Sequence, residues 1–168
     1  MHNIAYTIDP AIQPIIAKKK LDGMFGAALD IEWIENGKDA GLPLSGKAYP
    51  SMANYLMQSD VIVITLIPGL SLGAMVSIEL VKDSAIVTHI ISPRDAEPQF
   101  KLLPTDSLMR SIAVSAKTAK LVLAAPPVPG KPIEGHIEFE TIVFYQKDGT
   151  GLIERTYKAA GYFKAAKM

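Results

Sequence analysis

The clearest alternation of hydrophobic and polar positions lies near the end of the chain. From Ile133 to Tyr145 the odd-numbered positions are mostly apolar, and from Glu134 to Glu140 the even-numbered positions are glutamate or histidine. A two-residue period of this kind is typical of a β-strand that buries one face. After a turn-rich run at residues 146–151, a second alternation extends over residues 153–164. Together these segments predict a long C-terminal β-hairpin.

The charged residues of this hairpin specify its register. With residues 148–150 as the loop, Glu140 lies opposite Lys158 and Glu134 lies opposite Lys164. The same register makes four further pairs: Tyr145 with Ile153, Thr141 with Tyr157, Ile137 with Gly161 and Gly135 with Phe163. A slip of one residue would lose both ion pairs and would put apolar partners on opposite faces. The sequence therefore predicts a single register.

The rest of the chain also favours strands. Short strands are predicted at residues 3–8, 27–35, 60–67, 74–81, 85–91 and 120–124. The run 60–67 is rich in β-branched residues at both odd and even positions. That pattern predicts a central strand that is covered on both sides.

Helix is indicated in fewer places. Residues 15–20 follow Pro14 and predict one short helix, and Ser51 is a suitable N-cap for a second one that extends to Gln58. Residues 107–117 fit a helix and a strand equally well. The proline-rich run 126–132 predicts a stiff connector that leads into the terminal hairpin.

These elements together predict the fold class. The chain has 168 residues, which is the usual size of one domain with one core. Seven or eight strands joined by Pro- and Gly-rich turns, with one or two short helices, predict a mainly β protein. We expect a single-domain antiparallel β-sandwich or barrel over residues 1–168, with a long C-terminal hairpin.

Charge and hydropathy exclude some classes of partner. The 17 basic and 17 acidic residues balance, so no overall field attracts nucleic acid. Hydrophobic residues make up 49% of the chain and the mean hydropathy is +0.21, which is high for a soluble domain. Some of this apolar surface is therefore expected to be covered by a partner, and we expect a homo-oligomer.

The expected location is the cytoplasm, as synthesised, because the first residues lack the basic and apolar regions of a signal peptide. The most apolar run, Val61 to Ala74, is interrupted by Pro68-Gly69 and is too short to span a membrane. The chain has no cysteine, which excludes disulfides and thiolate chemistry.

Only one group of residues suggests a metal. His136, Glu138 and Glu140 share one face of a predicted strand. However, metal sites usually draw converging ligands from more than one segment, and this face also meets Lys158 and Lys164. We therefore favour a solvated, ion-paired surface and expect no cofactor. His89 lies within a predicted strand without a partner residue beside it, so a structural role is favoured.

The terminal hairpin also suggests an interaction surface. Ile142, Phe144 and Tyr162 are predicted on its outer face, beyond the ion pairs, where exposed apolar residues are typical of assembly surfaces. The first hypothesis is thus a non-enzymatic β-rich structural or interaction protein that self-associates through this hairpin. The alternatives are a small barrel or sandwich that binds an apolar ligand, and an enzyme whose site is assembled only in three dimensions.

Overall fold

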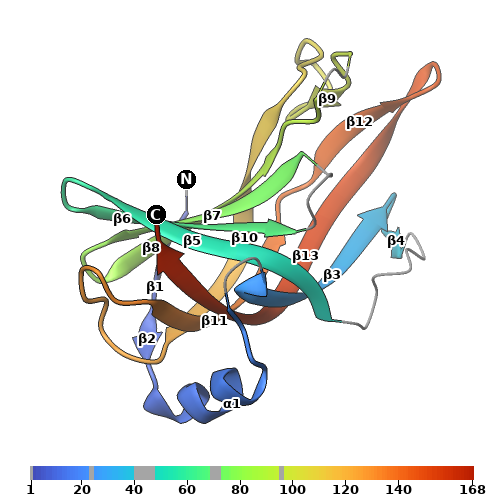
Figure 1. Ribbon diagram of the computed structural model, residues 1–168. Coiled ribbons are helices and arrows are strands. Elements are labelled where there is room, and N and C mark those ends of the chain that lie inside the picture. Colours follow the sequence, from blue (N-terminus) through green and yellow to red (C-terminus); the bar gives the residue numbers. More distant parts are fainter. Residues whose placement is uncertain (1, 23–24, 40–47, 69–72, 95–96) are drawn as a thin grey trace.

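The computed structural model describes residues 2–22, 25–39, 48–68, 73–94 and 97–168, and these form a mainly β fold (Figure 1). The strands are β1 (Asn3–Ala5), β2 (Thr7–Ile8), β3 (Ala27–Glu35), β4 (Lys38–Asp39), β5 (Ala48–Gln58), β6 (Val61–Pro68), β7 (Ala74–Val81), β8 (Ser84–Ile91), β9 (Phe100–Lys101), β10 (Ile112–Leu123), β11 (Ile133–Thr141), β12 (Phe144–Asp148) and β13 (Gly151–Lys167). A 3-10 turn (Pro10–Ile12) leads into the short helix α1 (Gln13–Lys18). No helix in the described part of the chain is long and apolar enough to cross a membrane.

The eight longest strands close into an antiparallel barrel. Each of β3, β5, β6, β7, β8, β10, β11 and β13 pairs with the next in chain order, and β13 pairs back with β3. The strands at the two ends of the sheet order, β4 and β9, have only two residues each. Closure leaves no long free edge among the described strands. The expectation of a mainly β antiparallel fold with a short helix and a long C-terminal hairpin is confirmed, and the pairing is that of a barrel.

Apolar side chains fill the barrel. Alternate residues of each strand point inward, and several large ones have an exposed fraction below 2%: Tyr55, Ile64, Leu66, Ile78, Leu121, Ile137 and Phe163. An eight-stranded barrel is just wide enough for side chains to fill it. A second, smaller cluster lies beside it, made by Ile91, Phe100, Ile112, Val114 and Phe144. Trp33 packs against both clusters and joins them.

The predicted register of the C-terminal hairpin is confirmed over most of its length. Glu140 pairs with Lys158, Glu134 with Lys164, Ile137 with Gly161, and Gly135 with Phe163. The ion pairs form across 3.7 Å for Glu140 with Lys158 and 3.9 Å for Glu134 with Lys164. At Thr141 the contact is made by the side chain, because the Tyr157 backbone N–H donates to Thr141 Oγ1 over 3.0 Å.

Beyond Thr141 the predicted register is wrong by one residue. Phe144 lies opposite Arg155 and Tyr145 opposite Glu154, so Tyr145 does not pair with Ile153. One extra residue is accommodated in the break between β11 and β12, where the Ile142 backbone N–H donates to the Ser115 carbonyl. Since the side-chain period is two, this extra residue exchanges the inner and outer faces of β12 relative to the prediction, whereas Tyr157 and Phe163 of β13 stay inside as expected.

Two other predictions require correction, and one open assignment is decided. Residues 51–58 belong to β5 and are not helical, because they pair with β6 along their whole length. The undecided stretch 107–117 is strand from Ile112 onward, in β10. The strand β6 is central, but only one of its faces is fully buried: Ile64 and Leu66 are inside, while Val61 and Val63 on the other face are half-buried.

Candidate functional site

The structure separates the three residues that were expected to form an interaction surface. Ile142 is 40% exposed, but Phe144 is fully buried in the second apolar cluster. The placement of Phe144 on the outer face is therefore wrong, and the extra residue before β12 is the reason. Tyr162 is half-buried: its ring lies 4.5 Å from that of His136, and the Lys19 ammonium lies over it at 5.2 Å.

His136, Glu138 and Glu140 do share one outward face, but they do not converge. His136 Nδ1 lies 3.9 Å from Glu138 Oε1, whereas Glu140 is paired with Lys158. Burial lowers the pKa of His136; Glu138 opposes this, while Lys120 and Lys19 add to it. Among the residues that the structure describes, no group of three or more His, Asp or Glu side chains could hold a metal ion.

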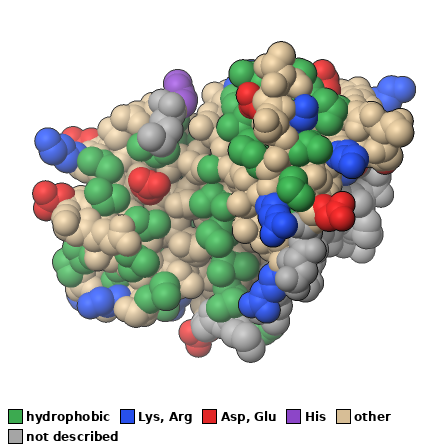
Figure 2. All heavy atoms as spheres, turned by 90° about the horizontal axis from the view of Figure 1, so that it is seen from above, with side chains coloured by type: hydrophobic (Ala, Val, Ile, Leu, Met, Phe, Trp, Pro, Cys, Tyr) green, Lys and Arg blue, Asp and Glu red, His purple; other side chains and the backbone are tan. Residues whose placement is uncertain are grey.

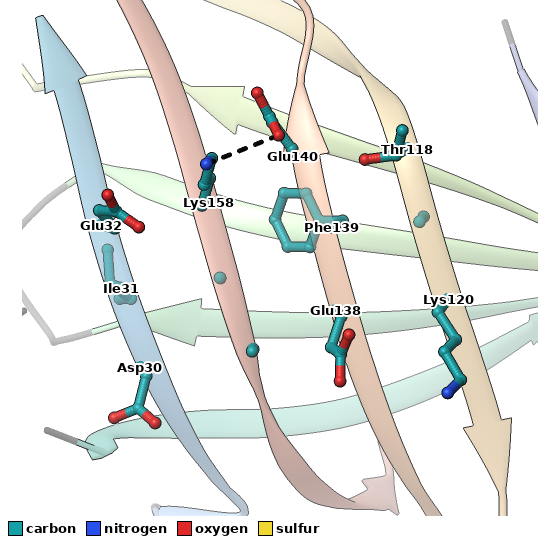
Figure 3. Close-up of a pocket in the computed structure, with 12 residues that line it drawn as sticks. Asp30, Ile31, Glu32, Thr118, Lys120, Glu138, Phe139, Glu140 and Lys158 are labelled. Atoms are coloured by element: carbon teal, nitrogen blue, oxygen red, sulfur yellow. Dashed lines mark ion pairs between the residues drawn. The ribbon is translucent and has the colours of Figure 1, made fainter. Parts of the chain in front are cut away.

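These strands border a shallow groove on the outside of the barrel, with a volume of about 480 Å³ (Figure 3). Its charged residues come from β3, β10, β11 and β13: Asp30, Glu32, Lys120, Glu138, Glu140 and Lys158. The short side chains of Thr118 and Ala160 also line it. Charges of both signs facing solvent are typical of a hydrated surface, and we assign the groove no ligand.

The side formed by β5 to β8 is very different. The outward positions of these four strands carry a set of hydrophobic residues, which are half-buried or, at Val81, exposed. We call them the apolar face: Met52, Leu56, Val61, Val63, Ile67, Met75, Val81, Ile86 and Ile90. A polar row of Asn54, Thr65, Ser77 and Thr88 crosses it. In the described part of these strands, Glu79 is the only charged residue at an outward position.

Figure 2 looks at the molecule from above, with β6 and β7 toward the left and the ends of β9 and β12 toward the right. In the left part hydrophobic side chains are spread over the surface, and the charged side chains lie mostly toward its edges. The barrel thus has a charged wall at the groove and an apolar wall at β5 to β8. The apolar wall is visible in the sequence, since β6 is hydrophobic at both odd and even positions.

Inside the barrel, aromatic rings from distant segments meet around a histidine. His89 of β8 has an exposed fraction of 0% and stacks on Tyr157 of β13, with ring centroids 3.9 Å apart and an interplanar angle of 7°. Trp33 of β3 contacts both rings edge-on, at 4.8 Å from Tyr157 and 5.9 Å from His89. We call these three residues the aromatic centre.

Buried polar atoms of His89 and Tyr157, and Nε of the neighbouring Arg155, lack well-formed hydrogen bonds. Among the described residues, no partner of good distance and angle is found for either ring nitrogen of His89, for the Tyr157 hydroxyl or for Arg155 Nε. Burial lowers the pKa of His89 to about 4, an effect that a weaker hydrogen bond with the Met75 backbone partly offsets, and burial raises the pKa of Tyr157. At neutral pH both side chains are therefore uncharged.

An ion pair lies beside the aromatic centre. Arg155 lies over the Trp33 ring at 5.6 Å, and one of its terminal nitrogens is 2.8 Å from Glu35 Oε1. This arrangement could not be predicted from the sequence, because His89 and Tyr157 are brought together only by the closure of the barrel. The structure places His89 in a strand, as expected, at a buried position beside polar groups that its neighbours in sequence do not reveal.

Comparisons of the chain with protein-family models, with curated proteins and with solved structures find no match.

Proposed function

We propose that the protein is a non-enzymatic building block that self-associates, with the apolar face of one barrel packed against the apolar face of a second copy. The observation that supports this is the contrast between the two walls of the barrel. Among the described side chains of β5 to β8, nine hydrophobic residues and a single carboxylate occupy outward positions. Exposed apolar surfaces of this extent are typical of protein–protein contacts.

The size of the apolar face fits an interface between two copies. A strand spacing of about 4.8 Å and a rise of about 3.3 Å per residue give four strands a flat area of roughly 20 by 25 Å. The accessible area of a surface with side chains is larger than this projection. Stable complexes bury on the order of 800 Å² per partner, so the face and its rim supply an ordinary interface.

The charges of the chain favour the same arrangement. With 17 basic and 17 acidic residues, two copies do not repel each other at long range. Packing through the groove side would instead remove water from six charged side chains, of which only Glu140 and Lys158 are paired with each other. Self-association is therefore assigned to the apolar face.

Two routes suggested by the terminal hairpin are less suitable. Phe144 is buried within its own chain, so it is not free to contact a second copy. Strand addition needs an open edge, and among the described strands those at the ends of the sheet order, β4 and β9, are very short. In face-to-face packing, two sheets about 10 Å apart contact each other through their side chains, and the apolar face provides outward side chains for such a contact.

The mass of the protein in solution tests the proposal. Light scattering after size exclusion should give a mass at least twice 18.1 kDa at micromolar concentration. Combining Val63→Lys with Ile90→Lys puts two charges on the apolar face and should lower the mass toward that of one chain, with an unchanged circular dichroism spectrum. The matched control, Thr118→Lys with Ala160→Lys in the groove, should leave the mass as in the wild type.

Two results would contradict self-association through the apolar face. One is a wild-type protein that remains a monomer at high micromolar concentration. The other is an oligomer whose mass is the same in the apolar-face variant and in the groove control, which would place the contact elsewhere on the barrel.

A further inference from the structure

The aromatic centre contains more polar atoms than a packed core requires. It lies where Trp33 joins the two apolar clusters, and phenylalanine at positions 89 and 157 would fill the same space with rings. A buried polar group without a partner costs about 1–3 kcal/mol, and native proteins leave few such groups. Burying the imidazole and the hydroxyl therefore lowers the stability of the fold unless another group forms hydrogen bonds with them.

We infer that the aromatic centre is a binding site for a small uncharged molecule with a hydroxyl or carbonyl oxygen, held by the Tyr157 hydroxyl and a ring nitrogen of His89. This inference does not depend on self-association, because the centre lies inside the barrel and the apolar face lies outside it. The surrounding Trp33 and Phe139 rings, the latter 5.8 Å from Tyr157, suit a flat hydrocarbon body.

The charges of the site determine the class of ligand. Burial keeps His89 neutral and Tyr157 protonated, so the two side chains offer donors and an acceptor but no charge. The Arg155 guanidinium is already paired with Glu35 at 2.8 Å. An ion would lose its hydration here without gaining an opposite charge, which disfavours carboxylates and amines.

The stacking geometry restricts where the ligand lies. The His89 and Tyr157 rings are in contact at a centroid distance of 3.9 Å, so nothing fits between them. The ligand oxygen must therefore approach the edges of the rings, where the ring nitrogens and the hydroxyl are. Because side chains fill the barrel and Tyr157 is only 2% exposed, binding requires the surrounding side chains to move apart while the strands open transiently.

Trp33 makes the inference testable, since it is the one tryptophan of the chain and touches both polar residues. Titration with benzyl alcohol and with cyclohexanol should change its emission saturably in the millimolar range and raise the melting temperature. Benzoate and benzylammonium, which have similar size but carry a charge, should do neither.

Variants separate a binding role from a structural one. Tyr157→Phe removes only the hydroxyl, so the barrel should fold at least as stably while the dissociation constant for benzyl alcohol rises about tenfold. Tyr162→Phe, on the outer face, is the matched control and should bind as the wild type does. The inference is overturned if neither alcohol gives a saturable change, if Tyr157→Phe binds equally well, or if benzoate competes on equal terms.

Discussion

Acidification is expected to destabilise the barrel through His89. The folded protein holds this imidazole neutral, with a pKa lowered from 6.5 to about 4 by burial. In the unfolded chain the pKa returns to about 6.5, so between these values the unfolded state binds the additional proton. The stabilisation from neutral His89 is therefore fully present above about pH 6.5 and is lost as the pH falls toward 4.

The size of this effect follows from the pKa difference. A depression of roughly 2.5 pKa units, at about 1.36 kcal/mol per unit, lowers the free energy of unfolding by about 3 kcal/mol. Domains of this size have a total stability on the order of 5–15 kcal/mol, so the loss is a large fraction of it. His136 acts in the same direction, because burial lowers its pKa as well.

The assay compares the wild type with His89→Phe, which keeps a ring stacked on Tyr157 but cannot titrate. Urea unfolding followed by circular dichroism, at one protein concentration and between about pH 7 and about pH 4, gives the free energy of unfolding for each. The contributions of His136 and of the carboxylates cancel in the difference. Over this pH range the free energy of unfolding of the wild type should fall by about 3 kcal/mol more than that of His89→Phe. His2→Ala, at the exposed N-terminal segment, is the control and should follow the wild type. Parallel curves for the wild type and His89→Phe would show that His89 is not held neutral by burial.

Two substitution pairs test the corrected hairpin and the closure of the barrel. Phe144→Ala, at a fully buried ring, should lower the free energy of unfolding by about 3–5 kcal/mol, whereas Val143→Ala, at a residue 44% exposed, should change it by less than about 1 kcal/mol. Equal effects in urea unfolding would refute the exchange of faces after Thr141. A Cβ at Gly161 would overlap the Ala28 carbonyl across the β13–β3 pairing, so Gly161→Ala should cost at least about 2 kcal/mol. Gly151→Ala meets only Asp148 O at 3.8 Å, and its melting temperature should match the wild type.

The part of the fold that could be predicted is the part whose polar residues alternate strictly with apolar ones. Glu134 and Glu140 have lysines at the matching positions of β13, and the register followed from those pairs. The extra residue before Phe144 could not be located, because residues 141–144 include no charge, glycine or proline that would mark the irregularity. A period-two pattern without polar residues gives no information about which face is inside.

The wrong helix at residues 51–58 has a different cause. This stretch contains Met, Ala, Leu and Gln, which favour helix, after a serine suited to capping. In the structure it pairs with β3 and β6, and those long-range hydrogen bonds outweigh local propensity. The aromatic centre could not be predicted either, since nothing near His89 in sequence identifies Tyr157 as its neighbour.

The strand β6 is hydrophobic on both faces, but its own chain fully buries only one of them. Hydrophobic residues on both faces predicted a strand covered on both sides, yet within one chain only the face with Ile64 and Leu66 is fully buried. The outward positions of β11, in contrast, carry glutamates. Hydrophobic outward positions are therefore not a general feature of the strands of this barrel. The described part of the chain leaves the outward valines of β6 only half-buried. The partner that we propose to cover them is a second copy of the chain. Because Val63 points outward opposite Glu79, charging that position tests assembly and not the folding of the barrel.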